Sequence, residues 1–164
     1  DLGSGTGASY SDLKNFDVTA LDPDEKMLSL NNLKKKVVGR GEELPFEENS
    51  FDNVLCCFVW RNMADTEKAL NEVYRVLKPG GKFILLDMTR PKNFFLKLLH
   101  KIGTFALLHF VGFITFNLKE YRFLYKSLDF YPQPEDHLTE DKYENLLIHR
   151  MGLFDFVYLA VFTK

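Results

Sequence analysis

Residues 51–88, FDNVLCCFVWRNMADTEKALNEVYRVLKPGGKFILLDM, hold a helical pattern between two short apolar segments. Residues 51–58 and 82–88 are rich in β-branched and aromatic side chains and are bounded by turn residues, as buried parallel strands are. A strand, a helix and a second strand in this order predict a parallel pair joined by a right-handed crossover.

The helix between them has a start signal, a stop signal and one apolar face. Asp65 is placed as an N-cap, and the Lys-Pro-Gly segment 78–80 ends the helical pattern. The apolar face comprises Ala69, Leu70, Val73, Val76 and Leu77. We therefore expect this helix to cover one face of the sheet.

The same alternation occurs earlier, with strand patterns at 16–22 and 36–40 on either side of a helical segment, 24–35. The sequence predicts an α/β fold with a Rossmann-like, doubly wound, mostly parallel sheet in a three-layer αβα arrangement. A length of 164 residues, 46% of them apolar, suits a single domain over 1–164.

Charge and cysteine content argue against several classes of function. The formal net charge of −2 gives no overall attraction to nucleic acid. Adjacent Cys56 and Cys57 cannot easily bridge within an extended strand, and no spaced Cys/His set predicts a metal site. The most apolar run, 102–116, is shorter than the ~20 residues of a membrane-spanning helix, and no signal peptide opens the sequence. These features predict a cytoplasmic protein.

The opening segment, DLGSGTG, places glycine at every second position from Gly3 to Gly7. Ligands of doubly wound sheets bind where a strand leads through a loop into a helix, and glycine lets the backbone approach them closely. A purely conformational glycine turn is the alternative. Asp22, at the end of the next predicted strand, can accept both hydroxyls of a ribose, whereas Asp24 is better placed to cap the following helix.

The glycine spacing alone leaves two cofactors open, because Gly3, Gly5 and Ala8 satisfy the G-x-G-x-x-A pattern of NAD-binding loops. The carboxylate of Asp1 separates the two. It would stand where the pyrophosphate of NAD meets helix N–H groups, and it suits an ammonium group instead. S-adenosylmethionine (SAM) carries an amino acid ammonium group, so Asp1 favours SAM.

Five segments in order, DLGSGTG, GRGEELPFEENSFDNV, FVWRNMAD, ALNEVYRVLKPGGKFILLDMTRP and YRFLYKSL, resemble the class I SAM-dependent methyltransferases. The resemblance is strongest to the ubiquinone/menaquinone biosynthesis C-methyltransferases, the UbiE-like family, and it covers nearly the whole chain. It implies a Rossmann-like sheet that binds SAM. It also implies transfer of the SAM methyl group to a ring carbon of a prenylated aromatic quinone precursor.

The resemblance assigns roles to individual residues. The implied cofactor-binding positions are Asp1 at the methionine ammonium, Gly3, Ser4, Gly5, Thr6 and Gly7 in the loop, Asp22 at the ribose, Arg40 and Gly41 at the adenine, and Cys57 and Phe58 along the pocket. The polar positions near the methyl acceptor are Arg61, Asn62, Tyr121, Arg122 and Ser127, and the catalytic candidates among them are Tyr121, Arg61 and Asn62. A buried structural tyrosine is the alternative for Tyr121.

Arg40 and the two chain ends depart from the family pattern. Arg40 stands where the family has an acid that accepts from the adenine amino group, and a guanidinium has only donors. Backbone at Arg40 and Gly41 or the side chain of Glu42 would have to replace that acid, or SAM binding would be weaker. The resemblance also implies a truncated N-terminus without the first strand, and a shortened C-terminal edge with room for one strand in 151–164.

Residues 91–130 form the insert or lid expected to select the acceptor. At 100° per residue, one helical face carries Asn93, Lys97, His100, Lys101 and Thr104, and the opposite face carries Phe95, Leu98, Leu99, Ile102 and Ala106. In one interpretation the apolar face packs on the core and the basic face is solvated. In the other, 93–116 is a lid or a peripheral membrane contact through which a lipid-tailed substrate enters.

The sequence leaves two further functions open. One is SAM-dependent methylation of another small molecule, because related methyltransferases share their loops and differ in the insert. The other is a cofactor-binding or partner-binding module without turnover, which Arg40 and the missing ends suggest. The oligomeric state is not predicted.

Overall fold

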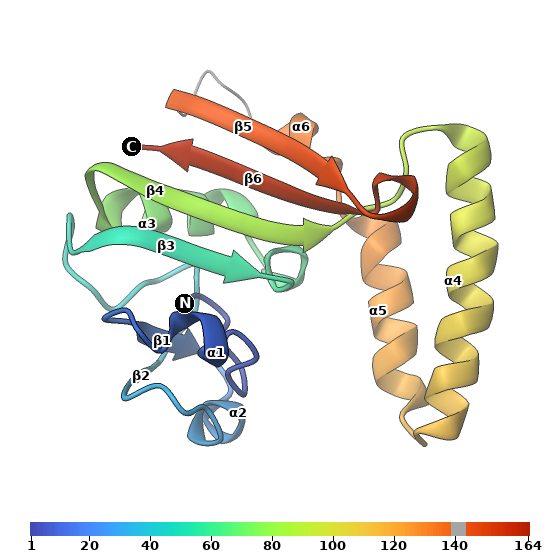
Figure 1. The fold of residues 1–164 in the computed structure, drawn as a ribbon, viewed down its shortest axis with the longest axis horizontal. Helices are drawn as coiled ribbons and strands as arrows, with labels where there is room; N and C mark the ends of the chain where they lie inside the picture. The colour runs from blue at the N-terminus through green and yellow to red at the C-terminus, as the bar shows by residue number, and fades with distance from the viewer. Residues whose placement is uncertain (139–143) are drawn as a thin grey trace.

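The structure, a computed structural model, describes residues 1–138 and 144–164, and its central feature is a sheet in two parts (Figure 1). Strands β1 (Thr19–Asp22) and β2 (Lys35–Val38) pair in parallel. The second part has the order β3-β4-β6-β5, and its strands are β3 (Phe51–Cys57), β4 (Leu77–Met88), β6 (Val157–Thr163) and β5 (Glu144–Met151). Strands β3 and β4 are parallel, while β6 is antiparallel to both of its neighbours.

Leu2 connects the two parts of the sheet. It forms isolated parallel bridges with Leu21 of β1 and Cys56 of β3, and its backbone N–H donates to the carbonyl of Leu55 at 2.8 Å. Its buried side chain joins the main hydrophobic core. Strands β1 and β3 therefore present their carboxyl ends at the same edge, next to the loop that follows Leu2.

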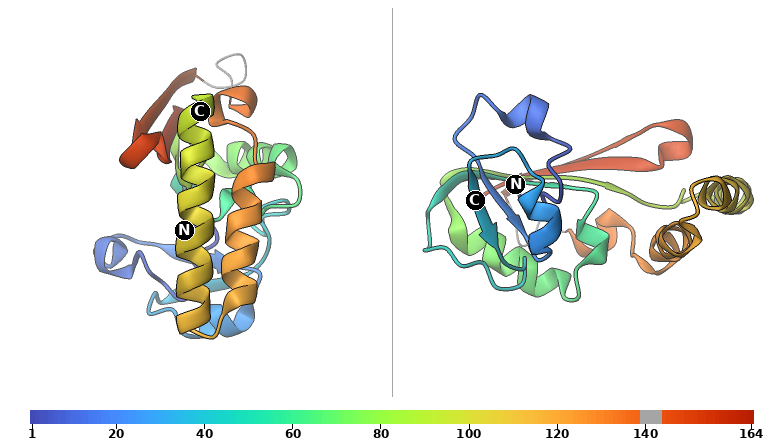
Figure 2. Two further views of the ribbon diagram at one scale, coloured as in Figure 1. Left: turned by 90° about the vertical axis from the view of Figure 1, so that its right-hand side faces the viewer. Right: turned by 90° about the horizontal axis from the view of Figure 1, so that it is seen from below.

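Helices lie on both faces of the sheet. Figure 2 shows α1 (Tyr10–Leu13) on one face and α3 (Thr66–Val76) on the other. The side chain of Asp65 accepts from the backbone N–H of Lys68 at 2.9 Å, which confirms the predicted N-cap. The predicted apolar face of α3 is buried against the core around Trp60 and Phe83. The predicted α/β architecture is confirmed.

The helix predicted for 24–35 is much shorter in the structure, where α2 covers Glu25–Ser29. The cause is Asn31, whose side-chain oxygen accepts from the backbone N–H of Leu33 at 2.9 Å and whose amide donates to the carbonyl of Gly5 at 3.3 Å. A side chain that bonds to nearby backbone in this way competes with the helical hydrogen bonds. Asp24 caps α2 as predicted.

The expectation of a shortened C-terminal edge is wrong, because β5 and β6 form a complete antiparallel pair. Residues 144–151 mix polar and apolar side chains and therefore show no clear strand pattern in the sequence. In the structure it is an edge strand, and its residues alternate between exposed and half-buried positions from Asn145 to Arg150. Such alternation is typical of a strand with one solvated face.

Helices α4 (Phe94–Ile114) and α5 (Leu118–Phe130) form an antiparallel hairpin that projects from one end of the sheet (Figure 1). Its orientation overturns the interpretation in which the apolar face packs on the core. Phe95 and Ile102 are 77% and 61% exposed, whereas His100 of the polar face is 8% exposed. His100 and Thr104 of the polar face are turned toward the protein, whereas Asn93 and Lys97 are exposed. A short helix, α6 (Pro134–His137), follows α5.

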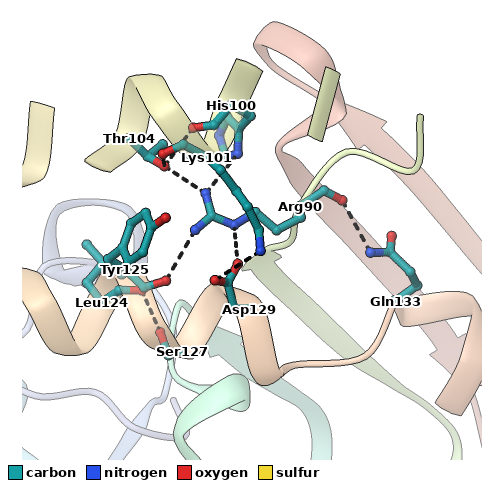
Figure 3. Close-up of polar contacts among 9 residues, drawn as sticks. All are labelled: Arg90, His100, Lys101, Thr104, Leu124, Tyr125, Ser127, Asp129 and Gln133. Carbon is teal, nitrogen blue, oxygen red and sulfur yellow. Dashed lines mark hydrogen bonds and ion pairs between the residues drawn. The ribbon is translucent and has the colours of Figure 1, made fainter. Parts of the chain in front are cut away.

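Arg90, two residues after the end of β4, explains this orientation. Its completely buried guanidinium donates to Asp129 at 3.0 Å, to Thr104 at 2.7 Å and to the carbonyl of Tyr125 at 3.3 Å, and it lies 3.2 Å from Nδ1 of His100 (Figure 3). A buried guanidinium must find acceptors for its donors. Both hairpin helices therefore turn polar groups toward Arg90, and the apolar side chains of α4 face outward.

Candidate cofactor and acceptor site

The glycine loop folds back on the end of β1. The backbone N–H groups of Gly3 and Ser4 donate to the carbonyl of Leu21 at 2.8 and 3.0 Å. Gly3 has φ +71°, and a Cβ there would lie 2.5 Å from Cγ1 of Val59. Glycine is therefore required at this position both by the backbone conformation and by close packing.

The carboxylate of Asp22 holds this loop by hydrogen bonds to its backbone. Its buried carboxylate accepts from the N–H of Gly5 through Oδ2 at 2.8 Å and from the N–H of Asp24 through Oδ1 at 2.9 Å. Each carboxylate oxygen can accept more than one hydrogen bond, so both keep capacity for a ligand hydroxyl. The structure thus brings the predicted ribose acceptor, Asp22, next to the glycine loop.

A cavity of about 210 Å³ lies beside the loop. Its lining residues are Leu2, Gly3, Leu21, Pro23, Arg40, Gly41, Glu42, Val59, Asn62, Met63 and Ala64. Three predicted cofactor residues, Gly3, Arg40 and Gly41, are therefore among its walls. Ser4, Gly5 and Asp22 are buried in or against the same loop.

The remaining predicted cofactor residues lie around this loop. The carboxylate of Asp1 is 3.4 Å from the hydroxyl of Ser9, and Thr6 is exposed at the outer turn of the loop. Cys57 is half-buried at the end of β3, and burial raises the pKa of its thiol. Phe58 follows with φ +60°, and its N–H donates to the carbonyl of Leu86 at 2.7 Å.

Two observations bear on whether this loop suits SAM. The hydroxyl of Ser4 is buried and has no hydrogen-bond partner within 1–138 and 144–164, and an unsatisfied buried hydroxyl is costly unless a ligand completes it. Glu42 directs Oε1 to the backbone N–H groups of Ala64 and Asp65, at 2.8 and 3.4 Å. That carboxylate is thus partly engaged in holding the loop before α3. The unpartnered hydroxyl of Ser4 in the loop and the cavity beside Gly3 fit a polar nucleoside cofactor.

A second cavity of about 560 Å³ adjoins the first. Its lining residues are Arg61, Asn62, Met63, Ala64, Thr66, Phe123, Lys126, Ser127, Tyr131 and Pro132. Three of them, Asn62, Met63 and Ala64, also line the cofactor cavity. The two cavities therefore share part of one wall, at the end of the short helix η1 (Trp60–Asn62).

Arg61 is held firmly at the wall of this second cavity. Its guanidinium forms an ion pair with the completely buried Asp87, and its backbone N–H donates to the same carboxylate at 3.0 Å. It also donates to the carbonyl of Phe58 at 3.0 Å and, through Nε, to the hydroxyl of Ser127 at 3.4 Å. The ends of β3 and β4 and the helix α5 thus meet at one side chain.

The structure separates the acceptor candidates. Arg61, Asn62 and Ser127 line one cavity, whereas Tyr121 lies on the hairpin and does not line either of the two cavities described. Its ring packs at Gly112 of α4, where a Cβ would lie 3.2 Å from Cδ2 of Tyr121. Arg122 is exposed.

Sequence reasoning missed three residues near this cavity: Asp87, Tyr131 and His137. Asp87 had a usable signal, because it is an acid near the carboxyl end of a predicted buried strand, where ligands of such sheets bind. Tyr131 and His137 follow α5 in a segment without a motif. Only the folded chain brings them to the cavity.

This sheet, with a glycine loop and adjoining cavities at the carboxyl ends of its parallel strands, has the fold of the SAM-dependent methyltransferases. A structure from Thermotoga maritima described as a SAM-dependent methyltransferase, possible histamine N-methyltransferase, matches with a TM-score of 0.70 and 23% identity, covering 99% of this chain and 80% of that one. A SAM-dependent methyltransferase from Aquifex aeolicus matches with a TM-score of 0.60 and 16% identity, covering 99% and 79%.

The chain belongs to the ubiE/COQ5 methyltransferase family, whose sequence profile matches residues 3–145. The ubiquinone/menaquinone biosynthesis C-methyltransferase UbiE of Rickettsia felis is 38% identical over 135 residues, which are 74% of this chain and 54% of that protein. The UbiE of Rickettsia bellii is 36% identical over 137 residues, 83% of this chain and 55% of that protein. The predicted family is confirmed, and the chain spans about half the length of these curated relatives.

Proposed function

We propose that the chain transfers a methyl group from SAM to a ring carbon of a phenolic quinone precursor with an apolar tail. The observation that carries this proposal is the pair of adjoining cavities that share Asn62, Met63 and Ala64. One lies beside the glycine loop and suits the cofactor. The other presents Arg61, Ser127 and Tyr131 to a second ligand.

The first cavity and its loop hold the cofactor in this proposal. SAM supplies an electrophilic methyl group on a sulfonium when it is bound. Asp22 accepts the ribose hydroxyls, and the Ser4 hydroxyl finds a partner in the ligand. Arg40 and Gly41 contribute backbone to the adenine, with the Arg40 side chain directed to solvent.

The second cavity positions the acceptor. Methyl transfer requires the ring carbon, the methyl group and the sulfur to lie in line. It also requires a more electron-rich ring, which results when the ring hydroxyl gives up its proton. A fixed guanidinium such as that of Arg61 stabilises negative charge developing on a ring oxygen, because its geometry is set before the reaction by Asp87. Asn62, at the boundary of both cavities, is placed to orient the same hydroxyl.

The composition and exposure of the helical hairpin favour two parts of the proposal, an apolar tail on the acceptor and contact with a lipid surface. Helix α4 carries two Lys, two His and no acidic residue, and the side chains of Phe95, Leu98, Ile102, Phe110 and Phe113 form an exposed apolar face. By length and composition, its 21 residues are enough to cross a membrane. We propose instead that this apolar face lies in the interface of an anionic membrane, with the sheet on the cytoplasmic side.

A binding and a turnover measurement test the proposed function. Calorimetric titration is expected to show SAM binding that is tighter than NAD binding. A radiolabelled methyl assay is expected to show label transfer to a prenylated phenol or naphthol, faster than to the tail-less analogue. Tighter binding of NAD contradicts the cofactor assignment. An equal or better rate with the tail-less compound contradicts the tailed acceptor.

A further inference from the structure

Tyr131, in the wall of the acceptor cavity, and His137, behind that wall, form a hydrogen-bonded pair. Tyr131 follows α5 and lines the cavity, and its hydroxyl lies 2.6 Å from Nε2 of His137 at the end of α6. The two rings are in edge contact, with centroids 5.0 Å apart. The imidazole of His137 therefore lies directly behind a residue of the cavity wall.

The direction of this hydrogen bond follows from its neighbours. Nδ1 of His137 lies 2.9 Å from the carbonyl oxygen of Gln133, which can only accept, so Nδ1 carries the proton. In the neutral imidazole Nε2 is then an acceptor, and the Tyr131 hydroxyl donates to it. The Tyr131 oxygen has two lone pairs, so it can accept from a ligand even where the nearby Tyr158 hydroxyl donates to it.

The surroundings keep both groups neutral. Burial lowers the pKa of His137, and this effect outweighs the opposing effects of the Gln133 carbonyl, Asp136 and Glu135. The Glu135 carboxylate is in turn paired with Arg150 at 2.7 Å. At neutral pH the imidazole is therefore a free base.

Tyr131 is also held in its neutral form. Burial raises the pKa of Tyr131 strongly, and nearby Tyr158, Asp87 and Cys56 raise it further. A stable tyrosinate is thus unfavourable. The Tyr131 hydroxyl can take up one proton only while it gives up another.

We infer that Tyr131 and His137 form a proton relay for the ring hydroxyl of the methyl acceptor, an inference that rests on the proposed function. The acceptor O–H bond breaks as its proton moves to the Tyr131 oxygen, and the Tyr131 proton moves to Nε2 of His137. The imidazolium of His137 holds the transferred proton at Nε2. The electron pair left on the ring oxygen activates the ring carbon. The new C–CH₃ bond then forms as the bond between sulfur and methyl breaks. The ring C–H proton is then transferred to the ring oxygen, which restores the hydroxyl and the aromatic ring. The proton held by His137 is released to water and is the one net proton per methyl group.

The relay supplies a proton acceptor that Arg61 cannot provide. A guanidinium has donors only, and the carboxylate of Asp87 is fully buried and engaged by Arg61. Arg61 can therefore stabilise a ring oxyanion but cannot remove its proton. Tyr131 and Arg61 line the same cavity, and in this inference the ring hydroxyl lies between them.

The test compares Tyr131→Phe, His137→Gln and the matched control His149→Gln, in which an exposed histidine of β5 is replaced. In the full chain, methyl transfer is measured with phenols of decreasing hydroxyl pKa. With a weakly acidic phenol, both relay variants are expected to lose roughly 100-fold in kcat, as general base catalysis supplies about that factor. With a phenol already ionised at the assay pH, this loss is expected to disappear. The control is expected to keep the parent rate throughout.

Two further measurements separate a relay from a structural role. The parent kcat is expected to fall on the acid side of the His137 pKa, and His137→Gln is expected to abolish that limb of the profile. In ¹⁵N NMR of the free chain, His137 is expected to show the Nδ1–H tautomer, with a pKa that changes in Tyr131→Phe.

The outcomes distinguish this inference from the proposed function. A loss of rate that is the same for every phenol, or an Nε2–H tautomer, overturns the relay while methyl transfer stands. A parent chain that transfers no methyl group to any phenol overturns the proposed function first.

Discussion

The carboxylate of Asp22 accepts from the backbone N–H of Gly5 at 2.8 Å, so a single side chain fixes the glycine loop to the end of β1. Asp22→Ala removes this bond and the proposed ribose acceptor together. Hydrogen bonds to charged groups contribute about 1.5–3 kcal/mol, so SAM affinity is expected to fall roughly 10- to 100-fold in calorimetric titration. Asp24→Ala is the matched control, because it removes the α2 cap but leaves the loop bond. Equal losses in both variants would contradict a role of Asp22 in binding.

Arg40 is exposed beside the cofactor cavity, and its side chain cannot accept from an adenine amino group. Arg40→Asp restores an acceptor at this position. SAM affinity is therefore expected to stay unchanged or to increase, as measured by calorimetry at matched ionic strength. A marked loss of affinity would show that the guanidinium itself has a binding role.

Arg90 joins the hairpin to the sheet through Asp129 and Thr104. Arg90→Ala leaves these partners without a buried donor, and the loss of one member of a buried pair costs about 3 kcal/mol. We expect lower stability in urea denaturation and faster amide exchange in α4 and α5 than in β3 and β4. The exposed Arg122→Ala is the control. Uniform acceleration of exchange over the whole chain would contradict a local role of Arg90 in holding the hairpin.

His100 makes stability depend on pH. Burial and the positive charge of Arg90 lower the pKa of His100 below its usual 6.5. Below about pH 6.5 the unfolded chain therefore binds a proton that the folded chain excludes, and the free energy of unfolding falls as the pH decreases. His137, whose pKa burial also lowers, acts in the same direction.

Urea denaturation at about pH 7.5 and about pH 5.5 measures this dependence. His100→Gln is expected to reduce the difference between the two pH values, because glutamine can still accept from Arg90 but does not titrate. His149→Gln is the matched control. An unchanged difference in His100→Gln would contradict this assignment.

The exposed apolar face of α4 predicts reversible association with anionic vesicles. Phe95→Glu changes a side chain that is 77% exposed, and Phe16→Glu changes one that is 70% exposed on the body of the domain. Transfer of one large apolar side chain is worth about 1.5–3 kcal/mol, so Phe95→Glu is expected to reduce vesicle binding by at least about tenfold. Phe16→Glu is expected to leave it unchanged. Sedimentation with vesicles measures both.

Two lysines of the hairpin differ in their surroundings. Lys97 is exposed, whereas Lys101 lies 3.2 Å from the Asp129 carboxylate, so reversal of Lys101 would also disturb the hairpin. Lys97→Glu alone is therefore expected to weaken vesicle binding at low salt without changing SAM affinity. A chain that ignores vesicles and sediments as a dimer through α4 would assign the apolar face to a second copy.

The sequence by itself determined the parallel core of this protein. The strands at 19–22, 35–38, 51–57 and 77–88 overlap the predicted ones, and the caps Asp24 and Asp65 are where local spacing places them. These features depend on residues that are close in the sequence. In both caps, for example, a side-chain oxygen accepts from a backbone N–H group two or three residues later. The link between Asp22 and the glycine loop was also predictable, because strand order brings the carboxyl ends of parallel strands to one edge.

Only the tertiary structure decided which face of α4 meets the protein and which residues of the segment after α5 line the second cavity. A helical periodicity separates a polar face from an apolar one, but it does not identify the side that meets the protein. That choice was made by the buried guanidinium of Arg90, which requires acceptors from His100 and Thr104. The Tyr131 hydroxyl likewise meets the imidazole of His137 because the turn after α5 leads into α6 beside the sheet. Both contacts satisfy buried polar groups across separate elements, and such pairings exist only once the chain is folded.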